Sequence, residues 1–230
     1  MKLLTNWFGH GTTLPVELRQ RIADWHEVPP SDPLAPFSNA RYVVADTETS
    51  GLNPDTDRLL SVGAVGLHAG RIVLADSLEA TLRQTQPSTR DNIVVHGIGE
   101  SAQRGGEDPR EAMMRFLEYC GKCPVLAYHA PFDEAFVKRT AREQLGLTLR
   151  VAWLDLATIL PSLFDEKPRQ ALDFWLERFG IDVPLRHSAL GDALATAQLA
   201  QIAMRRAAVR GLLNFTALSR LSADSRWLHR

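Results

Sequence analysis

The amino-acid sequence predicts an α/β protein with a mixed five-stranded sheet flanked by helices on both faces. Two β-rich runs separated by the short turn His68-Ala69-Gly70 indicate an antiparallel hairpin. Further along the chain, helical patterns alternate with short apolar runs, which is typical of strands that join one sheet through helices. Apolar residues make up 45% of the 230 residues and charged residues 23%, so an ordinary buried core is expected.

Residues 1–37 are predicted to form a helical appendage and a proline-rich linker. A helix is expected because Leu18, Ile22 and Trp25 fall on one face at helical spacing. The stretch 29–36 contains several prolines, which neither a helix interior nor a central strand tolerates. The apolar face is expected to pack back on the main domain, and binding of a partner by this helix is the alternative.

Residues 38–210 are predicted to form the main domain. The expected strands cover residues 42–45, 59–67, 71–80, 125–128 and 151–154. The expected helices cover residues 109–119, 131–145, 170–179 and 189–210. Asp108 is expected to cap the first of these helices, and Gly146 and Gly180 to end two others. Residues 211–230 are expected to form a C-terminal helical tail.

The charge and hydropathy of the chain exclude some classes of function. The formal net charge is −1, so no overall basic field draws nucleic acid from a distance. No segment approaches the ~20 apolar residues that a membrane span needs, so no membrane partner is expected. The N-terminus lacks the apolar run of a secretory signal peptide, and the sequence therefore predicts a cytoplasmic protein.

Two acidic residues, Asp46 and Glu48, follow the first apolar strand. In an extended chain, side chains two residues apart point to the same side, so these carboxylates are expected to converge. Two such charges repel each other unless a positive group lies between them. Mg²⁺ and Mn²⁺ take oxygen ligands of this kind, so the pair predicts a divalent metal site.

Two further acids and a histidine stand in positions that fit the same site. Asp133 lies one turn into the helix after the fourth strand, and Asp192 lies near the start of the last long helix. If these ends meet at one edge of the sheet, the acids can hold two ions. His187 comes five residues before Asp192, and an imidazole with an unperturbed pKa of ~6.5 can accept a proton at neutral pH. Phosphodiester cleavage is therefore the leading hypothesis.

These motifs, taken together, resemble those of a known family. Residues 46–52, Asp-Thr-Glu-Thr-Ser-Gly-Leu, resemble the first motif of the DnaQ-like 3′–5′ exonucleases. Residues 130–133, Ala-Pro-Phe-Asp, resemble the second motif, and His187 with Asp192 resembles the third motif of the histidine-bearing (DEDDh) branch. The resemblance covers roughly residues 40–205. It implies a ribonuclease-H-like fold and the release of nucleoside 5′-monophosphates from a 3′ end.

The resemblance also implies a role for each motif residue. Asp46, Glu48 and Asp192 would bind one ion, with Asp46 shared by a second ion. Asp133 would act on that second ion directly or through water, and His187 would be the general base. Two Mg²⁺ or Mn²⁺ ions per active site are therefore expected.

A second group of residues is expected to contact the substrate. Its members are Thr47, Thr49, Leu52, His96, Ile98, His129 and Phe132. The segment around His96 and Ile98 is similar to the H-G-I segment that this branch uses near the 3′-terminal nucleotides. Leu52 and Phe132 are expected to wedge against terminal bases, with core packing as the alternative for Phe132.

Two positions depart from the usual pattern of the family. His129 occupies the place of an asparagine that helps to position the substrate backbone, which puts the sugar or base preference in doubt. Gly99 stands where a threonine commonly follows the H-G-I segment. Neither change removes a predicted metal ligand, so activity is expected.

The sequence thus predicts a metal-dependent 3′–5′ exonuclease that acts on single-stranded or frayed DNA, similar to the proofreading (epsilon) subunits of DNA polymerase III. A role in proofreading or repair and a polymerase subunit as partner are further expectations. Two alternatives stay open: an exoribonuclease that trims RNA 3′ ends, and a polymerase-associated nucleic-acid-binding module with little catalytic role.

Overall fold

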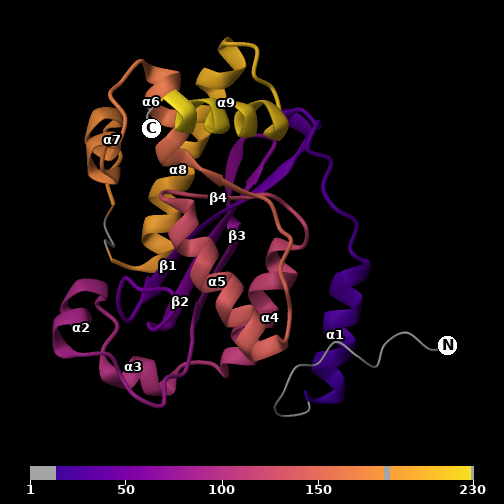
Figure 1. Cartoon of the computed structure of the whole chain (residues 1–230), viewed down its shortest axis with the longest axis vertical. Helices are drawn as coiled ribbons and strands as arrows, with labels where there is room; N and C mark the ends of the chain where they lie inside the picture. Colours follow the sequence, from indigo (N-terminus) through magenta and orange to yellow (C-terminus); the bar gives the residue numbers. More distant parts are fainter. Residues whose placement is uncertain (1–13, 184–186, 229–230) are drawn as a thin grey trace.

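The computed structural model describes residues 14–183 and 187–228, which form a mixed five-stranded sheet with helices on both faces (Figure 1). The strand order is β3-β2-β1-β4-β5. The strands are β1 (Arg41–Thr49), β2 (Leu59–His68), β3 (Arg71–Thr81), β4 (Val125–Ala127) and β5 (Trp153–Asp155). The first three pair antiparallel, and β4 and β5 continue the sheet in parallel with β1. The predicted α/β class and mixed sheet are confirmed.

The helices divide between the two faces of this sheet. One face is covered by α1 (Val16–Glu27), α4 (Pro109–Cys120) and α5 (Ala130–Leu145). The other face is covered by α6 (Leu156–Phe164), α7 (Leu172–Phe179), α8 (Ala189–Val209) and α9 (Phe215–Leu228). The short helices α2 (Arg90–His96) and α3 (Glu100–Gly105) connect β3 to α4 (Figure 1). No helix in the described part of the chain combines the length and apolarity that a bilayer crossing needs.

Side chains alternate along β1 and so define what each face of the sheet buries. Val43 and Ala45 belong to the core beneath α4 and α5. Tyr42 and Val44 belong to the second core, beneath α8 and α9. Because β1 continues to Thr49, the same alternation carries through the acidic motif, which lies within the strand rather than after it.

The N-terminal helix is part of the first core. Leu18, Ile22 and Trp25 are buried with the side chains of α4, and the Trp25 indole Nε1–H donates to the Leu117 carbonyl at 2.9 Å. The apolar face therefore packs on the rest of the chain, as predicted, and is not exposed to a partner. The boundaries of the appendage, main domain and C-terminal tail stay a prediction.

The structure also contains helices that the sequence patterns did not indicate. Helix α6 carries Pro161 in its interior. Because proline is unfavourable inside a helix, the sequence does not predict a helix there. Helices α2 and α3 are too short to show a clear apolar period. The fifth strand begins at Trp153 and ends at Asp155. It therefore starts two residues later and ends one residue later than the predicted strand.

Candidate active site

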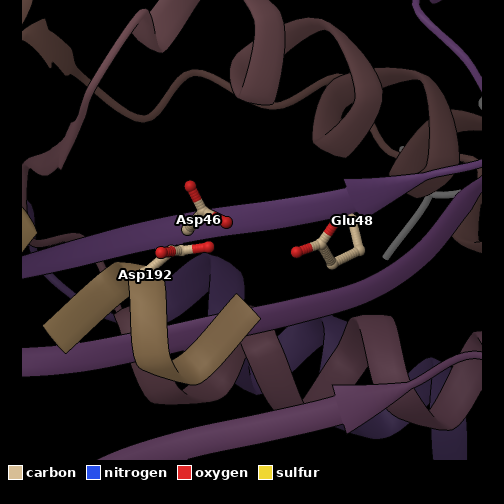
Figure 2. A group of neighbouring side chains, drawn as sticks. All are labelled: Asp46, Glu48 and Asp192. Atoms are coloured by element: carbon tan, nitrogen blue, oxygen red, sulfur yellow. The ribbon is translucent and has the colours of Figure 1, made fainter. Parts of the chain in front are cut away.

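Three carboxylates gather on the α8 side of the sheet. Each of Asp46, Glu48 and Asp192 offers an oxygen atom, and these atoms all lie within 4.8 Å of one another. Figure 2 shows the two side chains of β1 and the side chain of α8 directed toward a common space. The prediction that Asp46 and Glu48 share one side of an extended strand is therefore confirmed. We call Asp46, Glu48 and Asp192 the three-acid group.

The approach of α8 to β1 depends on a glycine in the neighbouring strand. Gly63 of β2 lies opposite Asp46 in the strand register. A Cβ atom on Gly63 would lie 2.2 Å from the carbonyl carbon of Ala189 and from the backbone nitrogen of Leu190, at the start of α8. These atoms belong to the helix backbone and cannot move aside as the end of a flexible side chain can. The absence of a side chain at this position lets α8 bring Asp192 beside Asp46.

The segment that leads into α8 contacts the Asp192 carboxylate through its backbone. His187 has φ +60°, and its backbone N–H donates to Asp192 Oδ2 at 3.0 Å. The next residue, Ser188, is the N-cap of α8, and its hydroxyl also donates to Glu79 Oε1 of β3 at 3.3 Å. The side chain of His187 is exposed. The backbone of the predicted base, His187, is therefore hydrogen-bonded to the carboxylate of Asp192, a predicted metal ligand.

The fourth predicted acid, Asp133, lies outside the three-acid group. It belongs to α5, on the opposite face of the sheet, and is 3% exposed. Its Oδ1 accepts a hydrogen bond from the Thr47 hydroxyl at 2.7 Å. The structure thus brings three of the four predicted acids into one group and holds the fourth across β1 from them.

The Asp133 carboxyl makes the free energy of unfolding depend on pH. Burial raises its pKa to about 7, although the Thr47 hydroxyl and nearby backbone N–H groups act in the opposite direction. In the unfolded chain this carboxyl ionises near ~3.9. The folded chain therefore binds more protons than the unfolded chain between these two values, and stability falls as the pH rises through that window.

Asp133→Asn is expected to remove this pH dependence. In EDTA, the stability of the parent relative to the variant should fall by on the order of 4 kcal/mol between about pH 4 and about pH 8. Chemical denaturation of both proteins at several pH values measures the difference. A stability difference that stays constant across the window would contradict a raised pKa at Asp133.

The side chains of two residues predicted to contact substrate are buried. Thr47 is 8% exposed and His96 is 2% exposed. The Ile98 backbone N–H donates to His96 Nδ1 at 3.0 Å, so the ring proton is on Nε2, which lies 3.0 Å from the Ser88 hydroxyl. Burial lowers the pKa of His96. The polar side-chain atoms of both residues are thus already bonded within the chain, and a contact of Thr47 or His96 with substrate stays a prediction.

Other predicted substrate residues remain accessible. Leu52 is 85% exposed in the turn after β1. Ile98 is half-buried directly before α3. Thr49 is half-buried, and its hydroxyl donates to the Gly51 carbonyl at 2.7 Å, which stabilises the same turn. Phe132 is half-buried against Phe136, with ring centroids 4.9 Å apart, so core packing accounts for part of its surface.

Asp155, at the end of β5, lies outside the family motifs and contacts the backbone at His129. His129 is exposed and has φ +62°, a left-handed backbone that is unusual for a residue other than glycine. Its backbone N–H donates to Asp155 Oδ1 at 3.0 Å, and the same oxygen accepts the Ala157 N–H at 3.0 Å. Burial raises the pKa of Asp155. In the sequence, an aspartate between a strand and a helix indicates a helix N-cap, which Asp155 is. The contact with the His129 N–H depends on the fold and has no signal in the sequence.

The fold and the three-acid group place the chain in a class of nucleases. A family model described as exonuclease, RNase_T, matches residues 43–200, and the chain belongs to this family. The predicted resemblance to the DnaQ-like exonucleases is therefore confirmed.

The chain is similar in sequence to proteins named for DNA polymerase III. It is 31% identical over 187 residues to a DNA polymerase III subunit epsilon-like protein of Rhodobacter capsulatus, covering 80% of this chain and 26% of that protein. It is 29% identical over 163 residues to a PolC-type DNA polymerase III of Thermotoga petrophila, covering 71% and 12%. The chain thus spans only a small part of the length of these relatives.

Solved exonuclease structures share the fold. Exonuclease I of E. coli in complex with a dT13 oligonucleotide superposes with a TM-score of 0.62 at 17% identity, covering 74% of this chain and 42% of that one. Exonuclease X in complex with 5′-overhanging duplex DNA gives a TM-score of 0.61 at 17% identity, covering 79% and 99%. At this level of identity the likeness extends to the fold, which is of the ribonuclease-H-like type.

Proposed function

We propose that the protein is a metal-dependent 3′–5′ exonuclease that removes nucleoside 5′-monophosphates from single-stranded or frayed DNA. The observation that carries this proposal is the three-acid group, assembled within a domain of the exonuclease family. The polymerase III names of its relatives support DNA as the substrate and a role in proofreading or repair. A polymerase subunit as partner and a cytoplasmic location stay predictions.

The donor set fits hard divalent cations. Three carboxylate oxygens within 4.8 Å of one another carry charge that a cation offsets, and Mg²⁺ and Mn²⁺ prefer oxygen ligands. Asp46, Glu48 and Asp192 would hold one ion. Asp46, together with Asp133 directly or through water, would hold the second. Bound ions would supply the Lewis acidity that strengthens a water nucleophile and offsets charge on the phosphate.

The remaining roles are those that the resemblance to the family implies for the other motif residues. His187 would accept a proton from the attacking water, since its side chain is exposed and its backbone N–H contacts the Asp192 carboxylate. Leu52 and Phe132 would contact the terminal bases, and Ile98 would contact the terminal nucleotide beside them. Thr49 would contact the terminal sugar, and His129 the substrate backbone.

Removal of divalent cations is expected to silence the enzyme. A matched set of DNA and RNA oligonucleotides, single-stranded and paired and labelled at the 5′ end, should be digested side by side with Mg²⁺, with Mn²⁺ and with EDTA. The expected result is stepwise shortening of single-stranded DNA from its 3′ end, no cleavage in EDTA, and recovery when either ion is restored. Cleavage that persists in EDTA, with contaminating nucleases excluded, would contradict the proposal. Faster digestion of RNA would instead favour the exoribonuclease alternative.

A further inference from the structure

The side chain between the two acids of β1 faces the opposite side of the sheet. Val43 and Ala45 point into the core beneath α5, and Thr47 continues this row by the two-residue period of a strand. Thr47 is 8% exposed, whereas Asp46 and Glu48 face α8 and are only half-buried. The sequence Asp-Thr-Glu therefore sends two carboxylates to one face and one hydroxyl to the other.

The Thr47 hydroxyl meets the one predicted metal ligand that lies on its own face. Helix α5 starts directly after β4, the parallel neighbour of β1, and this places Asp133 over Thr47. The hydroxyl donates to Asp133 Oδ1 at 2.7 Å. At 3% exposure the Asp133 carboxylate has little access to water, and a buried carboxylate without hydrogen-bond donors is strongly disfavoured.

We propose that Thr47 is a positioning residue that fixes the Asp133 carboxylate for the second divalent ion. Its hydroxyl holds one carboxylate oxygen and thereby ties Asp133 to the same strand that carries Asp46 and Glu48. This hydrogen bond opposes any shift of α5 relative to β1 that would move the Asp133 carboxylate. This inference rests on the proposed two-ion exonuclease and assigns to Thr47 a role in cation affinity in place of a substrate contact.

The test compares Thr47→Val, which removes the hydroxyl at nearly constant shape, with Thr47→Ser, which keeps it. Mn²⁺ binding to the full chain is measured by titration calorimetry and by electron paramagnetic resonance, both without substrate. Thr47→Val is expected to weaken the second ion by about tenfold or more, the scale of a hydrogen bond to a charged group, and to leave the first ion unchanged. Thr47→Ser is expected to retain both affinities.

Asp133→Asn is the control that shows whether Thr47 acts on Mn²⁺ binding through the Asp133 carboxylate. Adding Thr47→Val to Asp133→Asn should weaken Mn²⁺ binding no further, because the carboxylate that the hydroxyl holds is already gone. Thr47→Ala is a second hydroxyl-free variant for use if Thr47→Val does not fold in EDTA.

The outcomes separate this inference from the proposed function. A hydroxyl-free variant that binds both ions as tightly as the parent would overturn the inference and leave the exonuclease proposal intact. A Thr47→Ser variant as weak as Thr47→Val would overturn it as well. A parent protein that binds no Mn²⁺ would overturn the metal-dependent function itself.

Discussion

Asp46→Asn is expected to abolish both turnover and tight Mn²⁺ binding, whereas His187→Ala should abolish turnover alone. Asp46 contributes one of the three carboxylate oxygens that lie within 4.8 Å of one another, and asparagine keeps the shape of the side chain but loses its charge. The imidazole of His187 is exposed, and the backbone N–H of this residue donates to Asp192. Replacing the side chain keeps this backbone contact.

The expected losses of exonuclease rate are large, and a thermal unfolding measurement separates them from a loss of folded protein. Asp46→Asn should reduce the exonuclease rate by roughly 1,000-fold or more, the scale of losing one strong electrostatic contact to the transition state. His187→Ala should reduce it by about 100- to 10,000-fold, the range for a general base. In EDTA, Asp46→Asn should unfold at a temperature no lower than the parent, because one of three neighbouring like charges is removed.

End-labelled DNA digestion and Mn²⁺ calorimetry on the same preparations test both variants. Asp55→Asn is the matched control, since Asp55 is an exposed acid in the turn after β1 and does not belong to the three-acid group. Near-normal turnover in a folded Asp46→Asn protein would defeat the assignment of the site. Loss of Mn²⁺ binding in His187→Ala would show that this side chain acts on the cations rather than as a base.

Gly63→Ala is expected to disable the site from a position that touches neither metal nor substrate. The new Cβ would lie 2.2 Å from backbone atoms of Ala189 and Leu190, so the start of α8 must move away from β2. Asp192 and His187 are carried by this end of the helix and move with it. A displacement of about 1 Å in a catalytic group can lower the rate roughly 100-fold, and overpacking of this kind costs about 1–3 kcal/mol of stability.

The measurements for Gly63→Ala are the exonuclease rate, Mn²⁺ affinity and the free energy of unfolding. Gly105→Ala is a suitable control, because Gly105 is exposed and a Cβ there meets no atom within 4 Å. The control should leave all three quantities close to those of the parent. A Gly63→Ala protein with the parent's rate and Mn²⁺ affinity would show that the close approach at Gly63 does not determine where Asp192 lies.

The parts of the site that sequence could predict are those set by local geometry. The convergence of Asp46 and Glu48 follows from the two-residue period of a strand, and the structure confirms it. The start of α4 at Pro109 follows from the Asp108 cap, whose carboxylate accepts the Arg110 N–H at 3.0 Å. Both rules involve residues only a few positions apart.

The parts that sequence could not predict depend on which elements become neighbours. Thr47 was expected at the substrate, but its partner Asp133 is 86 positions away in the chain, and their contact depends on α5 covering one particular face. His96 is likewise buried through its contact with Ser88, a residue outside the motif. A period of two or of 3.6 residues shows which side chains share a face and cannot show which helix covers that face.

The contact between the His187 backbone and Asp192 has a consequence for how an exonuclease of this kind would respond to its ligands. The oxygen that accepts the His187 N–H belongs to a carboxylate that would also face a cation. Whatever strengthens one of these two contacts alters the free energy of the other, and such linkage is reciprocal. A nucleic-acid end that orders the backbone at His187 would therefore change the affinity for the cation by the same factor by which the cation changes the affinity for that end.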